Sequence, residues 1–264
     1  MAEPSDEVRR LAAQRSERRL ERDFAAADEL RARIRDLGFD VVDTPDGGFD
    51  LQPLVPAFEF SILWLNEGWP EDVQRGIEAF DRCHPDASIE HVVIDAEDGW
   101  GASRNAGLEA STAPVVVVVD GSVEPTGDVL TQLGSALDDP TVGVAGPVGA
   151  VTTDIREFEP SDGPDVDAIE GYLMAFRRDV LIQAGGFDRG FRFYRAADLE
   201  LSFRVKALGL RAVVVDVPIH RHEHRMWSTT PEEERDRLSK RNFYRFLDRF
   251  RDRTDLLVSN DEAT

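Results

Sequence analysis

The chain has 264 residues and a formal net charge of −21, from 52 acidic side chains against 31 lysines and arginines. This length suffices for one large α/β core with an appendage, and the negative field argues against general nucleic-acid binding because it repels phosphate backbones. The single cysteine, Cys83, excludes an internal disulfide and a cysteine-based zinc cluster, and without a ~20-residue apolar stretch or a signal-peptide pattern we expect a cytoplasmic protein.

The N-terminal segment, residues 1–52, predicts a helical hairpin followed by a small strand and turn. Apolar residues recur at intervals of three or four and end at a glycine, at Leu20, Phe24, Ala27, Leu30, Ile34, Leu37 and Gly38. The stretch ERDFAAADELRARIRDLGFDVVDTPDGG resembles the C-terminal part of cysteinyl-tRNA synthetases over about residues 16–48. This hairpin is expected to pack on the main domain or on a partner; contact with RNA through its arginines is the alternative.

The middle segment, residues 53–230, alternates between strand and helix patterns. Buried strands are expected at 58–65, 89–95 and 115–119, with amphipathic EDVQRGIEAFDRC and a short ASRNAGLEAS helix between them. Such alternation predicts a mostly parallel sheet with flanking helices. The segment has neither a GxGxxG after its first strand nor a P-loop. Residues 231–264 predict a C-terminal helix and tail, with an apolar face of Leu238, Phe243, Phe246, Leu247 and Phe250.

Asp120 follows five consecutive valines, Val115–Val119, in the stretch VVVVVDGSVEP. Five β-branched residues are typical of a central strand that is buried on both faces. In open α/β sheets, ligands bind at the carboxyl ends of the strands. Asp120 is therefore a candidate binding residue; the alternative is a turn-forming Asp-Gly pair.

From residue 58 to 228 the chain resembles glycosyltransferase family 2, whose members have the GT-A fold. Three ordered stretches carry the resemblance: VVIDAEDGWGASRNAGLEAS, VVVVVDGSVEP and GYLMAFRRDVLIQAGGFDRGFRFYRAADLELSFRVKALG. The resemblance implies an α/β fold of GT-A type and transfer of a sugar, of hexosyl type and with inversion, from a nucleoside-diphosphate donor to an acceptor hydroxyl. The acceptor that it implies is an unidentified glycan, lipid or small molecule. An acceptor at a membrane surface is one of these alternatives.

The resemblance also assigns roles. Asp95 would bind the nucleotide base, Arg104 would lie near base or phosphate, and Asp120 would face the ribose and a divalent metal, Mn²⁺ or Mg²⁺. Asp198 would be the general base. The plain alternatives are a turn or cap for Asp95, a helix-end arginine for Arg104, and an N-cap for Asp198.

Two positions depart from the family pattern. Ser122 stands where the family has a metal-binding carboxylate, although it remains a candidate contact of the nucleotide-sugar donor. Ala197 stands where the family has the first acid of a pair whose second member, Asp198, is the base. Glu124 is an alternative metal ligand to Ser122, and a side chain turned away from the metal is the other outcome of its position two residues further along the turn. A non-catalytic nucleotide-sugar-binding or scaffold protein with a decayed metal site is thus the rival interpretation.

The stretch VPIHRHEHRMW holds three of the five histidines, at positions 220, 222 and 224. Alternate residues of an extended segment share a face, so the three imidazoles are expected to point the same way. With Asp120, His222 and His224 are candidate metal ligands. A polar surface strand is the alternative.

Overall fold

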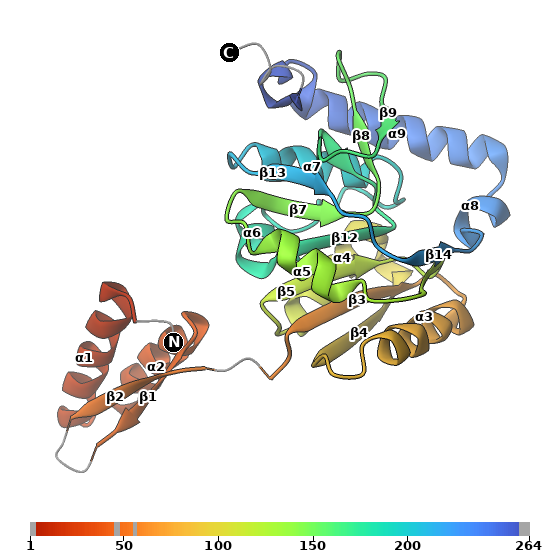
Figure 1. Ribbon diagram of the computed structural model, residues 1–264. Coiled ribbons are helices and arrows are strands. Elements are labelled where there is room, and N and C mark those ends of the chain that lie inside the picture. Colours follow the sequence, from red (N-terminus) through yellow and green to blue (C-terminus); the bar gives the residue numbers. More distant parts are fainter. Residues whose placement is uncertain (1–3, 45–47, 55–56, 259–264) are drawn as a thin grey trace. The chain divides into compact units, whose positions relative to one another are not determined.

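The computed structural model describes residues 4–44, 48–54 and 57–258. The chain divides into two compact units, Met1–Pro56 and Ala57–Thr264 (Figure 1). In the described residues no helix combines the length and the apolar character needed to cross a bilayer.

The first unit is a helical hairpin followed by a β-hairpin, and the predicted helical hairpin is confirmed. Its elements are α1 (Asp6–Leu20), α2 (Phe24–Asp36), β1 (Phe39–Asp43) and β2 (Phe49–Pro53), with β1 and β2 antiparallel. Ser5 caps α1 by accepting a hydrogen bond from the Val8 N–H, and Gly38, at φ +81°, leads from α2 into β1.

The apolar stripe read from the sequence is only partly buried in this unit. Ala27 and Ile34 are buried, but Leu20 and Phe24 are 85% and 58% exposed. These two residues flank the turn between the helices, where Arg22 has a φ of +62°, so one continuous helical stripe was the wrong interpretation. The core is completed from α1 and β1, by Val8, Leu11, Ala12, Phe39 and Val41.

The second unit is built on a seven-stranded mixed sheet. In spatial order its strands are β10 (Asp165–Val166), β13 (Arg211–Val214), β7 (Val142–Gly146), β12 (Leu173–Arg177), β5 (Val115–Val119), β3 (Phe60–Asn66) and β4 (Ile89–Asp95). β3 pairs in parallel with β4 and β5, and β13 with β7, whereas β12 and β10 are antiparallel to their neighbours. The predicted α/β fold of GT-A type is confirmed; the antiparallel β12 inside the sheet was not anticipated.

Helices cover both faces of this sheet (Figure 1). α3 (Pro70–Cys83) and α5 (Leu130–Leu137) pack on one face, and α4 (Trp100–Ala110), α6 (Arg178–Gln183) and α7 (Ala197–Lys206) on the other. Along β3, Ile62 and Trp64 pack in the apolar cluster under α3 and α5, while Leu63 and Leu65 pack in the cluster under α4, α6 and α7. A strand buried on both faces is apolar at successive positions, which explains the run Ile62–Leu65 in β3 and the five valines of β5.

Among the described residues, the remaining elements are eight short ones and one long helix, α9. They are η1 (Ala96–Asp98), β6 (Val123–Pro125), β8 (Gly149–Val151), β9 (Glu159–Ser161), β11 (Ala168–Ile169), β14 (Ile219–Arg221), α8 (Arg225–Thr229), α9 (Glu232–Phe250) and η2 (Thr254–Leu256). β14 pairs with β6, and β8 joins β9 and β11. Phe246 and Phe250 of α9 are buried in a cluster with Ile155, Phe203 and Leu257. The C-terminal helix is therefore part of this unit's core.

We predict that a chain beginning at Ala57 folds and unfolds cooperatively, because its apolar clusters include no residue of the first unit. Thermal unfolding followed by circular dichroism gives the measurement. A chain that ends at Thr230 is the control: it loses Phe246 and Phe250, and since each buried phenylalanine contributes about 3–5 kcal/mol, it should be much less stable. Loss of cooperative unfolding in the Ala57 chain would contradict the prediction.

Ala196 precedes α7 with a φ of +62°, in the left-handed region. This conformation costs a non-glycine residue roughly 1–2 kcal/mol, and glycine's extra freedom in the unfolded chain offsets part of any gain. Ala196→Gly should therefore raise the free energy of unfolding by about 0.5–1 kcal/mol in urea titrations. Ala196→Val should lower it, and an equal effect of both substitutions would show that the backbone at this position is not strained.

Candidate active site

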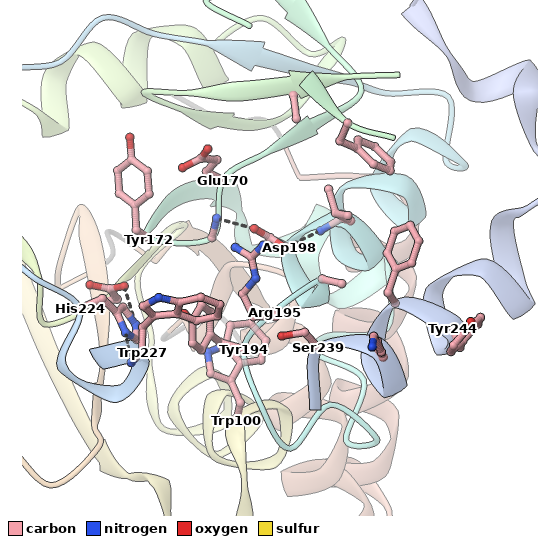
Figure 2. A pocket seen from close by; sticks show the side chains of 18 of the residues that line it. Trp100, Glu170, Tyr172, Tyr194, Arg195, Asp198, His224, Trp227, Ser239 and Tyr244 are labelled. Carbon is pink, nitrogen blue, oxygen red and sulfur yellow. Dashed lines mark hydrogen bonds and ion pairs between the residues drawn. The ribbon is translucent and has the colours of Figure 1, made fainter. Parts of the chain in front are cut away.

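A cavity of about 1060 Å³ opens where β3 and β5 end, and it brings together most of the residues singled out in the sequence. Its walls include Arg104, Asp120, Asp198 and His224, and two acidic residues that the sequence analysis missed, Glu67 and Glu170. Figure 2 shows Asp198 between two groups of side chains, with His224, Trp227 and Tyr172 on one side and Ser239 and Tyr244 of α9 on the other.

Asp120 is held at the end of β5 by hydrogen bonds to both carboxylate oxygens. Its Oδ1 accepts from the Ser122 backbone N–H at 2.7 Å and from the Ser122 hydroxyl at 2.5 Å, while Oδ2 lies 3.1 Å from His224 Nε2. Burial opposes ionisation, but the hydrogen bonds from His224 and Ser122 outweigh it and lower the pKa of the Asp120 carboxyl. Asp120 is therefore a fixed anion in the cavity wall.

Glu67 and His224 complete this charged group. Burial lowers the pKa of the His224 imidazole, but the hydrogen bond and charge of Asp120 and the charge of Glu67 raise it overall. Glu67 Oε2 lies 3.9 Å from His224 Nε2, and burial raises the pKa of the Glu67 carboxyl to about 7. Glu67 follows β3 as Asp120 follows β5. The rule that ligands bind at the carboxyl ends of strands could therefore have identified Glu67 from the sequence.

Arg104 lies on α4 and is 2% exposed. Its Nη1 donates to the Leu63 carbonyl at 2.6 Å and its Nη2 to the Val119 carbonyl at 3.0 Å, while Nε has no hydrogen-bond partner in the described part of the chain. Burial lowers the pKa of the guanidinium to about 10, opposed by the charges of Glu67 and Asp120. Arg104 stays charged at neutral pH and joins the middle of β3 to the end of β5.

Asp198 is the second residue of α7, which begins at Ala197. Its Oδ2 accepts from the Gly171 N–H at 3.0 Å and its Oδ1 from the Leu199 N–H at 2.9 Å. Burial raises the pKa of the carboxyl above its usual value, although these two hydrogen bonds oppose the shift. A carboxylate with a raised pKa is a stronger base.

A second charged group lies next to Asp198. Burial raises the pKa of the Glu170 carboxyl, and the Asp198 carboxylate adds to the shift. Arg221 approaches Glu170 at 3.8 Å, and its guanidinium stands over the Tyr172 ring, 3.7 Å from the centroid. Glu170 and Asp198 are 28 residues apart in the sequence. The hydrogen bond from the Gly171 N–H to Asp198 joins their two segments, a contact that no sequence pattern revealed.

Other candidates lie outside the cavity lining. Asp95 ends β4 and accepts a hydrogen bond from Asn66 Nδ2 at 2.7 Å. His222 Nε2 lies 2.7 Å from Glu124 Oε2, and the His220 and His222 rings are 4.5 Å apart. His224 instead leaves the strand and caps α8, where its Nδ1 accepts the Trp227 N–H. His220 and His222 thus lie together, and His222 contacts Glu124, whereas His224 contacts Asp120. The roles assigned to Asp95 and His222 stay predictions.

The side chains around Asp120 do not fit a resident divalent metal. Because His224 Nδ1 accepts a hydrogen bond at 3.2 Å, the proton of the neutral ring sits on Nε2, the nitrogen that faces Asp120. Ser122 supplies a hydroxyl that donates to Asp120 rather than a second carboxylate. Within residues 4–44, 48–54 and 57–258, no group of three or more histidine, cysteine, aspartate or glutamate side chains is placed to hold an ion.

Two solved structures are similar to this chain, and the first of them supports the fold. GalNAc-T7 in complex with UDP, GalNAc and Mn²⁺ superposes with a TM-score of 0.53 at 13% identity, covering 78% of this chain and 50% of that one. A mannosyltransferase from Pyrobaculum calidifontis, in complex with GDP-Man and Mn²⁺, gives 0.49 at 18% identity, covering 61% of this chain and 56% of that one. The chain thus spans about half the length of both.

Two sequence comparisons concern different parts of the chain. Thirty-nine residues are 56% identical to a cysteine–tRNA ligase of Bdellovibrio bacteriovorus, which is 15% of this chain and 8% of that protein. The model of glycosyl transferase family 2 matches residues 70–201, about half of the chain, including Arg104, Asp120 and Asp198. With this match over the cavity wall and the GT-A architecture around it, the chain belongs to glycosyl transferase family 2.

Proposed function

We propose that this protein transfers a hexosyl group from a nucleoside-diphosphate sugar to an acceptor hydroxyl, with inversion and with Asp198 as general base. One observation carries the proposal: the cavity that opens at the ligand-binding end of the sheet contains both the fixed Asp120 anion and the Asp198 carboxylate of raised pKa. The UDP and GalNAc in the GalNAc-T7 structure support a nucleotide-sugar donor for this fold.

In the proposed reaction, Asp198 takes the proton of the acceptor hydroxyl as its oxygen attacks the anomeric carbon. The bond between that carbon and the diphosphate oxygen breaks, and the nucleoside diphosphate leaves with the electron pair. Arg104, Arg195 and Arg221 line the cavity and offset the negative charge of the leaving group. Trp227, which is 37% exposed, offers a flat apolar surface for the base or the sugar, whereas Trp100 is buried in the cavity wall.

The Mn²⁺ of the GalNAc-T7 structure supports a divalent metal cofactor, Mn²⁺ or Mg²⁺, for this fold. The residues around Asp120 here lack a suitable donor set, so no step above is assigned to a metal. The same feature, with Ala197 in place of an acid, favours the second candidate function, a non-catalytic protein that binds nucleotide sugars. Donor binding is common to both candidates, whereas transfer distinguishes them.

Asp198→Asn should lower the rate of sugar transfer at least about a hundredfold, since a general base contributes about 10²- to 10⁴-fold. Asparagine has one acceptor oxygen, so either the Gly171 or the Leu199 N–H loses its partner and some stability is lost. Rates must therefore be measured well below the melting temperature, on a donor chosen by thermal shift among uridine, guanosine and thymidine diphosphate sugars.

Asp179→Asn is the matched control for this substitution. Asp179 lies in the first turn of α6 and accepts from the next backbone N–H at 2.9 Å, as Asp198 does, but it is 83% exposed and outside the cavity. Glu200 is unsuitable as a control because it is buried against Arg204 and Arg249. Parental transfer by Asp198→Asn would refute the mechanism, and a parent that binds donors but never transfers would favour the non-catalytic function.

Donor binding should not depend on a divalent metal, because the His224 proton faces Asp120 where an ion would lie. We expect dissociation constants for UDP or GDP within about threefold in chelator and in Mn²⁺. His224→Ala should weaken binding in both conditions, whereas His84→Ala, in the buried core, should act only through stability. Binding that is lost in chelator and restored by Mn²⁺ would show that Asp120 and His224 rearrange around an ion.

A further inference from the structure

The cavity continues beyond Asp198, away from His224, along one face of α9. Residues Lys240, Phe243, Tyr244, Leu247, Asp248 and Arg251 line it. They lie 3, 4, 7, 8 and 11 residues after Lys240, the pattern of one helix face, so they form one strip along about three turns that ends at the C-cap Arg251, roughly 16 Å long at 1.5 Å per residue. The lining also includes Phe158, which precedes β9, and Pro160, which lies in β9.

This α9 strip has three apolar side chains at its centre, Phe243, Tyr244 and Leu247, with charged side chains before and after them. Phe158, Phe243 and Leu247 are only half-buried, and Tyr244 is 66% exposed, so apolar surface is left open in the cavity. Asp248 is paired with Arg251 at 2.6 Å. Lys240 and Arg156 form no ion pair in the described residues. In a chain of net charge −21, two unpaired cations beside an apolar channel favour a ligand that is both apolar and anionic.

The strip is also oriented relative to the proposed base. In Figure 2, Ser239 lies on the side of Asp198 and Tyr244 lies farther along α9. Lys240 follows Ser239 directly, so its charge belongs to the end of the strip near Asp198, and Phe243, Tyr244 and Leu247 continue away from it. A ligand in this channel would place its polar end near Asp198 and its apolar end along α9.

We propose that the acceptor is an anionic amphiphile. Its hydroxyl lies at Asp198, its negatively charged group faces Lys240 and Arg156, and its apolar chain lies between the α9 strip and Phe158. This inference rests on the proposed sugar transfer, because it assigns the α9 half of the cavity to the acceptor. Such an amphiphile exists either as free monomers or within a membrane, and both present the same chemistry.

The test measures binding to the full-length protein without any transfer. The probes are decyl phosphate below its micellar concentration, ethyl phosphate and decanol, followed by calorimetry. We expect decyl phosphate to bind at least tenfold more tightly than either of the other two, because only it engages both the cations and the apolar strip. A sedimentation assay with phosphatidylcholine vesicles, with and without dicetyl phosphate, covers the membrane source.

Two substitutions identify the site. Lys240→Gln should weaken decyl phosphate at least fivefold and leave decanol unchanged, whereas Tyr244→Ala should weaken both; each side chain is exposed, so the fold is preserved. The matched control, Arg241→Gln, changes the next residue of the same helix, which is exposed and outside the cavity lining. It should change nothing.

Binding of the monomer that depends on Lys240 and Tyr244 supports a free amphiphile, and binding only to the anionic vesicles with the same dependence supports a membrane-held one. Equal affinity for ethyl phosphate and decyl phosphate, no binding to either source, or equal effects of Lys240→Gln and Arg241→Gln would overturn the inference. Transfer by the parental protein separates the outcomes: if the parent binds the amphiphile but never transfers sugar from any donor that it binds, the proposed function fails and the α9 site stands.

Discussion

The buried guanidinium of Arg104 is the interaction on which the arrangement of the site depends. A charge removed from water must be compensated by hydrogen bonds and by opposite charges. Arg104 obtains the first from carbonyls of two neighbouring strands, Leu63 within β3 and Val119 at the end of β5, and the second from Glu67 and Asp120. The two carboxylates that follow β3 and β5 are thereby kept at the same edge of the sheet. The His224 imidazole, which follows β14 and its pairing with β6, then directs its Nε2 toward both, 3.1 Å from Asp120 and 3.9 Å from Glu67.

Features with a local cause could be predicted from the sequence. The five valines before Asp120 identify a central strand, and the position of a strand end identifies one wall of the cavity without knowledge of any contact. The same reasoning applied to β3 would have added Glu67. Asp198 came from the family resemblance, and its place in the cavity agrees with that assignment, although its role as base remains a proposal.

Features that arise from long-range contacts could not be predicted in this way. The antiparallel β12 enters the sheet between β5 and β7 and brings Tyr172 and its neighbours to the cavity. Alternation in an extended segment predicted that His220, His222 and His224 would share a face, but that rule holds only while the strand continues. β14 ends at Arg221, and a helix cap then redirects His224 toward Asp120 while His222 contacts Glu124. The exposed Leu20 and Phe24 show the same limit for helical periodicity at a turn.

Asn242, on the buried side of α9, donates hydrogen bonds to the Phe193 and Arg195 carbonyls at 2.7 and 2.9 Å. These carbonyls belong to the segment that leads through Ala196 into α7 and Asp198. One helix thus fixes the approach to Asp198 with its inner face and lines the far half of the cavity with another. Substitutions along the lining face can change which molecules fit while the inner face keeps the carboxylate in place. In a protein of this architecture, selectivity for the proposed acceptor can diverge through α9 alone. The edge of the sheet, where the nucleotide-sugar donor is expected, need not change.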